Sequence, residues 1–277
     1  MFNTVIYHAG CYDGFASAYV AYTKLGDKAE YIPLSYYSKI PTFKNKNILV
    51  CDFSFDAKIA LKLMKNGCKI LFIDHHKTGI EKLADLPDEH KILDMDHCGA
   101  YLTFQYFYPD KEIPYYIKLI QDYDLWKFEF KDTEKFILAL NLLPTSFSRW
   151  KKLEKESYVK NLIQKGAVLH IHQQSIIDKI VKKYRTERQT INGINYRIIY
   201  RNTTSYVNEV ANYLVKNKNC DFAVCYHYDD KMNITRFNLR SIDSKADVSE
   251  VAKQFGGGGH RNASGLTLQG FKNKLFK

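Results

Sequence analysis

Three side chains capable of chemistry lie close together in the stretch YHAGCYDGF, residues 7–15. His8, Cys11 and Asp13 follow the apolar run TVIYH and could form a metal site, a cysteine nucleophile with its base, or an ordinary polar turn. A nucleophilic cysteine needs a base that faces it and a further group that orients the base. Because no second segment supplies an obvious orienting group or oxyanion hole, the cysteine-nucleophile interpretation is the least favoured of the three.

Two further apolar runs end in carboxylates and imidazoles. The run NILVCDF reaches Asp52, and the run CKILFIDHH reaches Asp74, His75 and His76. Strand-like and helix-like segments alternate here, a pattern typical of a mostly parallel sheet with helical crossovers. Ligands of such sheets bind beyond the carboxyl ends of the strands, so we expect these side chains to meet the first cluster at one edge. The elements predicted here are strands at 4–8, 29–36, 47–53, 68–76 and 90–96 and helices at 14–26 and 56–67.

Carboxylates and imidazoles without paired thiolates are typical ligands of Mn²⁺, Mg²⁺ or a dinuclear centre rather than of structural zinc. Asp52, on a central strand, is suited to bridge two cations, and two such cations can activate water and neutralise charge on a phosphoryl group. A weaker candidate is the stretch QDYDLWKF, in which Asp122 and Asp124 lie near the end of a predicted helix. On pattern alone, a solvated acidic turn is the favoured interpretation of that stretch.

The glycine-rich stretch FGGGGHRNASG, residues 255–265, predicts a different kind of site. Successive glycines let backbone N–H groups approach an anion, and His260 and Arg261 add donors. The stretch lacks the ending of a P-loop and the spacing of a dinucleotide fingerprint, so ATP or NAD binding is not indicated. Arg240, in the run NLRS, lies at a predicted strand end with room for a phosphate. A flexible loop and a surface charge are the alternatives, and phosphate binding is favoured over them.

The net charge of the chain lies in its second half. Residues 1–150 carry 18 Lys and Arg against 19 Asp and Glu, whereas residues 151–277 carry 23 against 11. A basic half suggests an anionic partner such as a nucleotide or nucleic acid, although lysine-rich surfaces also serve solubility alone.

Composition and pattern set the expected organisation. At 277 residues, one large or two medium domains are expected. The pattern turns helical from about 98, and the run from Ser157 to Arg188 is predicted as a helical linker. A smaller α/β unit follows, with a hairpin turning at Asp229–Asp230. Six scattered cysteines without a CxxC pair predict reduced thiols and a cytoplasmic location, and no apolar run or signal-like start predicts a membrane partner.

Six blocks, taken together, resemble the DHH family of phosphoesterases with the DHH-associated C-terminal domain, the group of nano-RNases, oligoribonucleases and nucleotide phosphodiesterases. In chain order they are HAGCYDG, CDFS, IDHHKTG, QDYDLW, NLRS and GGGGHRNASG. The resemblance implies an α/β fold in which a parallel-sheet catalytic domain, a helical linker and a smaller α/β substrate-binding domain enclose a cleft. The corresponding ranges are 1–150, 151–188 and 189–277. It also implies two divalent metal ions as cofactors, with Mn²⁺ preferred and Mg²⁺ or Zn²⁺ as alternatives.

The resemblance also assigns roles to residues of this chain. Its metal ligands would be His8 for the first ion, Asp52 as the bridge, and Asp13, His75 and Asp122 for the second ion. Asp122 is preferred to Asp124 because the aromatic residue of the family's motif falls four positions later, here Trp126. Asp74 would orient a ligand, and His76 would face the scissile phosphate. The residues that would bind substrate are Arg240, Ser241, Gly257, Gly258, Gly259 and His260.

One block departs from the family pattern. Many members begin His-x-x-x-Asp-x-Asp, and the first aspartate there binds the first metal. Here the run is one residue shorter and Cys11 stands nearest that place. A thiolate favours softer ions such as Zn²⁺, so the identity of the metal and the role of Cys11 stay open.

These observations predict a metal-dependent phosphodiesterase or phosphatase that acts on short RNA or DNA oligonucleotides or on small nucleotides. The alternatives are a non-catalytic nucleotide sensor, a RecJ-like exonuclease on single strands, and a nucleic-acid-binding protein without chemistry. The chain lacks the length for added oligonucleotide-binding modules, which favours short substrates. The exact substrate, the polarity of cleavage and the oligomeric state, a homodimer included, stay open.

Overall fold

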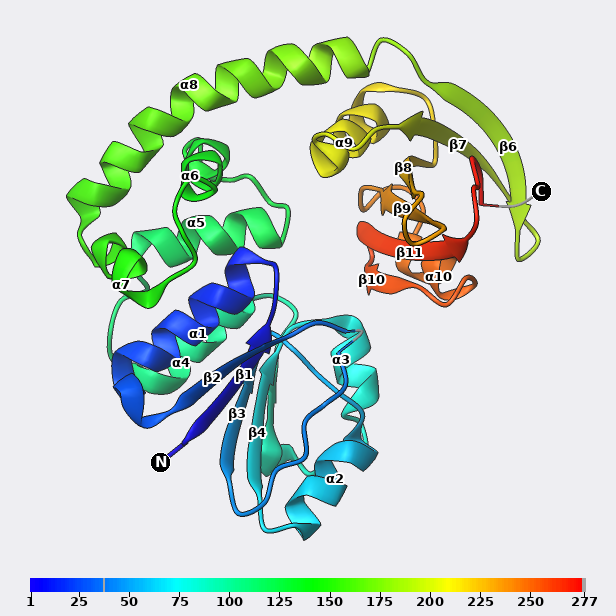
Figure 1. Ribbon diagram of the computed structural model, residues 1–277. Coiled ribbons are helices and arrows are strands. Elements are labelled where there is room, and N and C mark those ends of the chain that lie inside the picture. Colours follow the sequence, from blue (N-terminus) through cyan, green and yellow to red (C-terminus); the bar gives the residue numbers. More distant parts are fainter. Residues whose placement is uncertain (37, 276–277) are drawn as a thin grey trace. The chain divides into compact units, whose positions relative to one another are not determined.

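The protein is described by a computed structural model that covers residues 1–36 and 38–275 (Figure 1). The chain divides into two compact units, Met1–His170 and Ile171–Lys277, and each contains one β-sheet with helices packed against it. The predicted α/β fold class, with a parallel-sheet unit and a smaller second unit, is confirmed. The division falls within a helix of the segment predicted as a linker, while domain boundaries at 150 and 188 stay predictions.

The first unit is built on a five-stranded, wholly parallel sheet in the order β2-β1-β3-β4-β5. Its strands are apolar and buried at the centre because both faces are covered by helices. This strand order places a change of winding direction between β1 and β3. The strands are β1 (Thr4–His8), β2 (Glu30–Leu34), β3 (Asn47–Cys51), β4 (Lys69–Asp74) and β5 (Lys91–Leu93).

Helices of the first unit cover the sheet on both sides (Figure 1). Apolar residues of α1 and α4 pack on one face, and residues of α2 and the segment after α3 pack on the other. The remaining helices extend the cluster around α1 and α4. The helices are α1 (Tyr12–Leu25), η1 (Gly26–Lys28), α2 (Ala57–Lys65), α3 (Lys77–Lys82), η2 (Asp88–His90), α4 (Gly99–Phe107), α5 (Tyr115–Asp124), α6 (Thr133–Leu140), α7 (Phe147–Trp150), η3 (Lys151–Glu154) and α8 (Glu156–Ile180).

The second unit contains a six-stranded mixed sheet in the order β10-β11-β9-β8-β7-β6, in which only the β7–β8 pair is parallel. One face packs against α9 and the end of α8, and the other face packs against α10. Its elements are β6 (Arg185–Ile191), β7 (Ile194–Asn202), α9 (Val207–Asn217), β8 (Phe222–Asp229), β9 (Ile234–Arg240), α10 (Val248–Lys253), β10 (Gly258–His260) and β11 (Ala263–Gln269). The predicted hairpin is present as β8 and β9, and its loop is residues 230–233.

Two elements differ from the sequence-based expectation. The helix of the predicted linker ends at Ile180, and residues 185–188 belong to strand β6, which forms a hairpin with β7. The hairpin turns at Asn192 and Gly193, both with positive φ, and this Asn-Gly pair is the sequence signal that predicts such a turn. The glycine-rich stretch is only partly a loop, because Gly258–His260 pairs with β11 as an edge strand.

All six cysteines are free thiols. Among the helices that the structure describes, none combines the length and apolar character that a bilayer span requires.

Candidate metal centre

Three strands of the first sheet deliver polar side chains to the edge where the winding direction changes. His8 is the last residue of β1, Asp52 follows β3 directly, and Asp74 ends β4. The carboxyl ends of β1 and β3 diverge into helices on opposite faces, which leaves a crevice position that side chains can fill. The edge expected from the sequence is therefore the edge at which the structure gathers these residues.

Asp52 lies at the centre of the cluster and is buried. Its backbone has a φ of 53°, in the left-handed region that aspartate tolerates better than most residues. Its Oδ1 lies 3.1 Å from Nε2 of His75 and 3.7 Å from Nδ1 of His76, whereas its Oδ2 lies 3.4 Å from Nδ1 of His8. The two oxygens of one carboxylate thus face two different sets of nitrogen donors.

Three carboxylates surround one ring nitrogen of His75. Its Nε2 has carboxylate oxygens of Asp52, Asp13 and Asp124 at 3.1, 3.6 and 3.4 Å. One ring nitrogen carries at most one proton and cannot satisfy three carboxylates at once. A divalent cation among these atoms would neutralise them, and carboxylate and imidazole ligands fit Mn²⁺ or Mg²⁺ chemistry.

Two groups of donors could each hold one ion. Potential ligand atoms of Asp13, Asp52 and His75 lie within 4.8 Å of one another, and the same holds for His8, Asp52 and His76. Asp52 belongs to both groups, which is the arrangement that a bridging carboxylate requires. The residues present therefore fit a dinuclear metal centre.

The pKa values of the cluster reflect burial and mutual repulsion of its carboxylates. Burial and the neighbouring charge of Asp52 raise the pKa of Asp13 well above its usual value, and the same two causes raise the pKa of Asp124. Burial acts on Asp52 in the same direction, but hydrogen bonds with His75 and His8 outweigh it and hold the pKa of Asp52 well below its usual value. Burial opposes protonation of His75, yet the hydrogen bond with Asp52 and the surrounding carboxylates raise its pKa to about 10. The raised pKa values favour protonation of Asp13, His75 and Asp124. Bound metal ions would supply positive charge in place of those protons.

Asp13 is fixed by the N-terminus of a second helix. The backbone N–H groups of Gly99 and Ala100, which begin α4, donate to its two carboxylate oxygens at 2.6 and 2.8 Å. Gly99 has no room for a side chain, because an added Cβ would lie 2.6 Å from Cβ of Asp52. The sequence analysis did not identify Gly99 as part of the site. A single glycine after a cysteine does not indicate that its N–H group binds a carboxylate.

Asp74 contacts His75 and His76 and belongs to neither donor group, and its predicted role in orienting a ligand stays a prediction. Its Oδ1 accepts from the backbone N–H of His75 at 2.8 Å and lies 2.8 Å from Nδ1 of His76. Ser54 donates its hydroxyl to Oδ2 of Asp74 at 2.5 Å. Burial would lower the pKa of His76, but the Asp74 charge and hydrogen bond raise it above its usual value. Ser54 is within the CDFS block, but its bond with Asp74 depends on the loop after β3.

Cys11 lies against the donor group of His8, Asp52 and His76. Its Sγ accepts from the backbone N–H of Gly14 at 3.2 Å and so caps α1. The same sulfur lies 3.3 Å from Nδ1 of His8 and 3.2 Å from Oδ2 of Asp52. Burial and the charges of the nearby carboxylates raise the pKa of this thiol well above its usual value. The pKa shift opposes a nucleophilic thiolate in the metal-free protein, whereas the position suits a metal ligand.

The structure places Asp124, rather than the sequence-preferred Asp122, beside His75. Asp122 is buried, and its oxygens accept from the backbone N–H groups of Glu129 and Phe130 and from the hydroxyl of Thr133. Asp124, at the end of α5, has its Oδ2 3.4 Å from Nε2 of His75. The two residues are two positions apart on a helix and so point in different directions. The distances favour Asp124 over Asp122 as a ligand, and which of the two binds metal stays a prediction.

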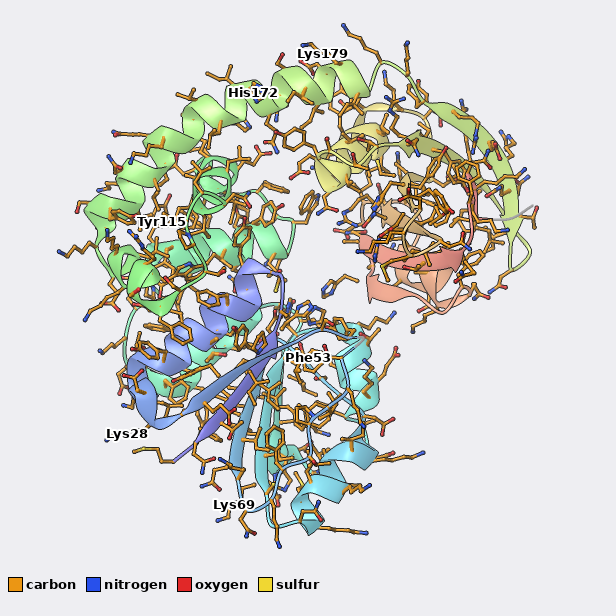
Figure 2. The ribbon with its side chains drawn as sticks, in the orientation of Figure 1. Lys28, Phe53, Lys69, Tyr115, His172 and Lys179 are labelled. Carbon is orange, nitrogen blue, oxygen red and sulfur yellow. The ribbon has the colours of Figure 1, made fainter. Side chains whose placement is uncertain are left out.

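Two aromatic rings border the donor group of His8, Asp52 and His76. Phe53, labelled in Figure 2, lies in a stacked orientation against the His8 ring, with centroids 6.2 Å apart. The Tyr36 ring is 5.0 Å from the His8 ring and 6.0 Å from the His76 ring. These rings give the donor group an apolar wall.

The predicted substrate-binding residues lie in the second unit and form two groups. Arg240 ends β9, and its guanidinium donates to Oδ1 of Asn208 at 2.6 Å and to the Leu239 carbonyl at 2.8 Å. Ser241 is buried, and its hydroxyl donates to the Asp221 carbonyl at 3.3 Å. The hydroxyl thus has a structural contact next to the end of β9, and its expected contact with substrate stays a prediction.

The glycines and His260 form the edge of the second sheet. Gly259 pairs with Ser264, and its φ of 137° and an added Cβ 2.5 Å from the Ala263 carbonyl both require glycine. An added Cβ at Gly257 would lie 2.3 Å from the Gly265 carbonyl. Gly258 and His260 begin and end the strand. These glycines allow close approach of two strands, and their predicted role in phosphate binding stays a prediction.

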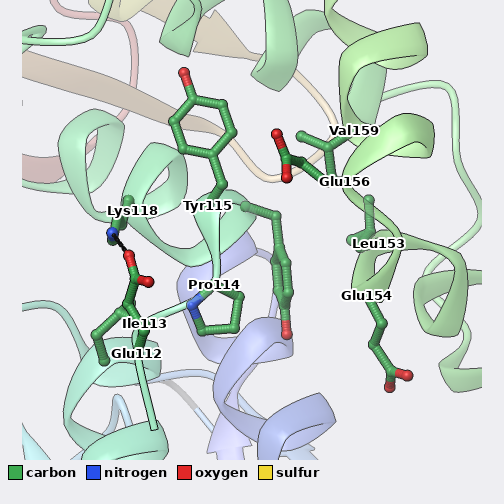
Figure 3. A pocket seen from close by; sticks show the side chains of 10 residues that line it. Glu112, Ile113, Pro114, Tyr115, Lys118, Leu153, Glu154, Glu156 and Val159 are labelled. Atoms are coloured by element: carbon green, nitrogen blue, oxygen red, sulfur yellow. Dashed lines mark hydrogen bonds and ion pairs between the residues drawn. The ribbon is translucent and has the colours of Figure 1, made fainter.

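A cavity of about 410 Å³ lies at the start of α5, at the opposite end of that helix from Asp124 (Figure 3). Its acidic side chains are already engaged: Glu112 pairs with Lys118 at 2.7 Å, and Glu154 accepts from the hydroxyl of Tyr19. The cavity therefore offers no obvious acid, base or ligand for the chemistry that the cluster supports.

Comparisons with known proteins agree with the architecture of both units. A family model described as the DHHA1 domain matches residues 192–276. Protein R106 of Acanthamoeba polyphaga mimivirus, described as uncharacterized, is 32% identical over 99% of this chain and 69% of its own length. Oligoribonuclease NrnB of Bacillus subtilis is 26% identical over 76% of this chain, which spans 55% of that relative.

A solved structure supports the fold. The pGpG-specific phosphodiesterase PggH of Vibrio cholerae matches 96% of this chain and 93% of its own with a TM-score of 0.55 and 10% identity. At that identity the likeness concerns the fold alone.

Proposed function

Since the chain belongs to the DHH family of phosphoesterases, we propose that it is a metal-dependent hydrolase of phosphoester bonds in short oligonucleotides or small nucleotides. The observation that carries the proposal is the position of Asp52, whose two oxygens face His75 on one side and His8 on the other. A carboxylate shared between two donor groups is the feature that a two-metal hydrolase needs and that a binding module does not.

We assign the ligands from the observed distances. His8 and Asp52, with Cys11 beside them, would hold the first ion, and Asp13, Asp52, His75 and Asp124 would hold the second. When bound there, two divalent ions such as Mn²⁺ would activate water and neutralise charge on the phosphoryl group. Mn²⁺ is preferred because most of the ligand atoms are oxygen or imidazole nitrogen.

The residues of the chain then have distinct tasks. Asp74 would hold His76 through Nδ1, so that the N–H group at Nε2 of His76 could donate a hydrogen bond to a phosphoryl oxygen. The N-terminus of α4 fixes Asp13 before any ion binds, which reduces the reorganisation that binding requires. Arg240 supplies a fork of donors for a phosphate of the nucleotide. The free thiols support a cytoplasmic location.

The proposal is tested with a panel of substrates and metals. The full chain is incubated with Mn²⁺, Mg²⁺ or Zn²⁺ and with RNA of two to five nucleotides, 3′-phosphoadenosine 5′-phosphate, cyclic di-AMP or long single-stranded DNA. We expect hydrolysis of short substrates, strongest with Mn²⁺, and little action on long strands. Asp110→Asn, at an exposed position, serves as a charge-matched control for variants of the cluster.

Each alternative has its own outcome in this panel. Tight nucleotide binding without product, with every metal, would support a sensor and overturn the hydrolase. Rapid degradation of long strands would support a RecJ-like exonuclease. Affinity for long strands that falls steeply with salt, without cleavage, would support a binding protein without chemistry.

A further inference from the structure

Basic side chains from three adjacent strands share one face of the second sheet. Cys225 on β8 pairs with Arg201 on β7 and with Asn238 on β9, and His227 on β8 pairs with Arg236 on β9. Paired residues point to the same face of a sheet, and so do residues two positions apart on one strand. The face is the one that packs against α9, because Cys225 belongs to the apolar cluster of that helix.

Two of these side chains have buried nitrogens without a hydrogen-bond partner among the described residues. They are Nε of Arg201 and Nδ1 of His227. A buried polar nitrogen without a hydrogen-bond partner is costly, so native structures rarely leave one unless a ligand or water fills the place. The two residues lie on neighbouring strands, with Arg201 opposite Cys225 and His227 two positions further along β8. One ligand could therefore accept from Nε–H of Arg201 and from Nδ1 of His227 when that nitrogen carries its proton.

The neighbouring arginines show what kind of ligand would fit. Arg240 is held by Asn208, and Arg236 lies 3.6 Å from a carboxylate oxygen of Asp229. Arg201 pairs with Cys225, and Arg240 pairs with Ala223, two positions earlier on β8, so both guanidinium groups start from the same face of the sheet. Burial raises the pKa of Cys225, and the charges of Arg240 and Arg201 act against that rise. Donors exceed acceptors in this group, so the missing partner is an anion.

We propose that Arg201 and His227 form a second phosphate-binding subsite, beside Arg240, that holds a terminal phosphate of a short oligonucleotide. The inference rests on the proposed function and deepens it by naming a feature of the substrate. Phosphate is favoured over a carboxylate because its oxygens can accept from a guanidinium fork and from an imidazole at the same time. The surroundings agree, since residues 171–277 carry 18 Lys and Arg against 9 Asp and Glu.

The subsite predicts that two phosphates bind better than one. A dinucleotide with a terminal phosphate offers one phosphate to Arg240 and a second to Arg201 and His227, whereas an unphosphorylated dinucleotide offers only its internal phosphate. A charged hydrogen bond contributes about 1.5–3 kcal/mol, which corresponds to a gain of roughly ten- to a hundredfold in affinity.

The test measures binding to the full chain by calorimetry, in an Asp52→Ala background that prevents turnover. The ligands are diadenylate with a 5′-phosphate, with a 3′-phosphate, or with neither, and inorganic phosphate. We expect one phosphorylated form to bind about ten- to a hundredfold more tightly than the unphosphorylated form. Arg201→Gln, which removes the guanidinium charge and keeps a polar side chain, should abolish that difference, and His227→Ala should reduce it.

The matched control is Arg188→Gln, which removes the same charge from an exposed position on the edge strand β6. Equal affinity of all three dinucleotides for the protein with Arg201 intact overturns the subsite, as does an unchanged preference in Arg201→Gln. Tight binding of inorganic phosphate that is lost in Arg201→Gln, without any preference among the dinucleotides, identifies a free-phosphate site and also overturns the proposal.

Failure of the subsite and failure of the proposed function are distinguishable. Hydrolysis of short RNA by the wild-type chain, with no preference for a terminal phosphate, removes the subsite and leaves the enzyme. Preferential binding of a phosphorylated dinucleotide without hydrolysis under any metal retains the subsite and removes the enzyme.

Discussion

The two units collect their polar side chains in different ways. In the first unit the candidate ligands lie at strand ends and in the loops that follow, as with His8 and Asp52. In the second unit Arg201 and His227 lie within strands, on one face of the sheet. A site at strand ends appears in a sequence as polar residues after an apolar run, whereas a site on a sheet face is hidden in the ordinary alternation of a strand.

The two regions also differ in charge. The first gathers the carboxylates of Asp13, Asp52 and Asp124 around the His75 nitrogen, and the second gathers guanidinium groups with few acidic neighbours. One region is suited to cations and the other to anions. A phosphoester bound to metal ions needs both, so the comparison predicts that damage to the first unit affects turnover and damage to the second affects binding.

The largest expected effect separates turnover from binding. Asp52→Ala should lower kcat by roughly a thousandfold, because loss of a bridging ligand removes several kcal/mol of charge stabilisation. Arg240→Ala should leave kcat nearly unchanged and raise KM by about tenfold, as expected for loss of one charged hydrogen bond. Steady-state kinetics on a short RNA substrate measures both. A thousandfold loss of kcat in Arg240→Ala would contradict the prediction that the second unit affects binding and not turnover.

A second pair of variants tests the assignment of Asp124 within the first unit. Asp124→Ala should weaken Mn²⁺ binding by about 10- to 100-fold, the range found when groups around a metal are removed. It should leave the metal-free protein no less stable, because it removes one of three mutually repelling carboxylates.

Asp122→Ala should leave Mn²⁺ binding unchanged and make the protein less stable. It leaves the N–H groups of Glu129 and Phe130 and the Thr133 hydroxyl without their acceptor and should lower the free energy of unfolding by about 2–3 kcal/mol. Calorimetry for metal binding and thermal unfolding for stability give the two readouts. Loss of Mn²⁺ affinity in a folded Asp122→Ala variant would return the ligand position to Asp122.

A third experiment asks whether Cys11 is a ligand. If its sulfur binds the first ion, the Co²⁺ complex should show a sulfur-to-cobalt charge-transfer absorption that is absent in Cys11→Ser. Zn²⁺ affinity should fall by about 10- to 100-fold in that variant, more than Mn²⁺ affinity, because thiolate prefers the softer ion. Cys220→Ser, in the second unit, serves as the control. Retention of the absorption in Cys11→Ser would exclude the sulfur as a ligand.

The last expected effect is gradual, a dependence of metal affinity on pH. The pKa of His75 in the metal-free fold is about 10, above its ordinary value of about 6.5, so its protonated form stabilises that fold fully below pH 6.5. This contribution is lost as the pH rises through about 10. Metal binding must displace the same proton, so Mn²⁺ affinity should rise by roughly tenfold per pH unit between pH 7 and 9.

Calorimetry at several pH values measures this slope, and the melting temperature of the metal-free protein should fall over the same interval. His97→Gln, which alters a partly exposed imidazole paired with Asp94, should keep the slope. An affinity that is independent of pH would show that His75 is not protonated in the metal-free protein.

Much of the metal centre could be predicted because its residues follow buried strands. The runs that end at His8, Asp52 and Asp74 are apolar enough to be assigned as strands, and parallel strands bring their ends to one edge. The choice between Asp122 and Asp124 could not be made in this way. Both lie in the last turn of α5, and the direction of each depends on how that helix packs and on the loop that Asp122 binds.

The second unit shows the same limit in its strands. The start of strand β6 was not predicted, because its residues continue the polar pattern of α8. The Asn-Gly pair at 192–193 is the signal that marks the turn after this strand. Ser241 lies in a block that suggests phosphate binding, yet burial at the end of β9 commits its hydroxyl to a carbonyl. Arg201 and His227 carried no signal, since single polar residues in alternating strands are common.

The sequence by itself determined the fold class, the family and the residue types that meet at the edge of the first sheet. The reason is that the spacing of apolar residues and the order of the motifs can be read directly along the chain. Only the tertiary structure decided which carboxylate faces His75, that Gly99 must lack a side chain, and that Arg201 and His227 share a face. The physical reason is that these facts depend on distances of a few ångströms between segments far apart in the chain. Such distances follow from packing, which no single segment encodes.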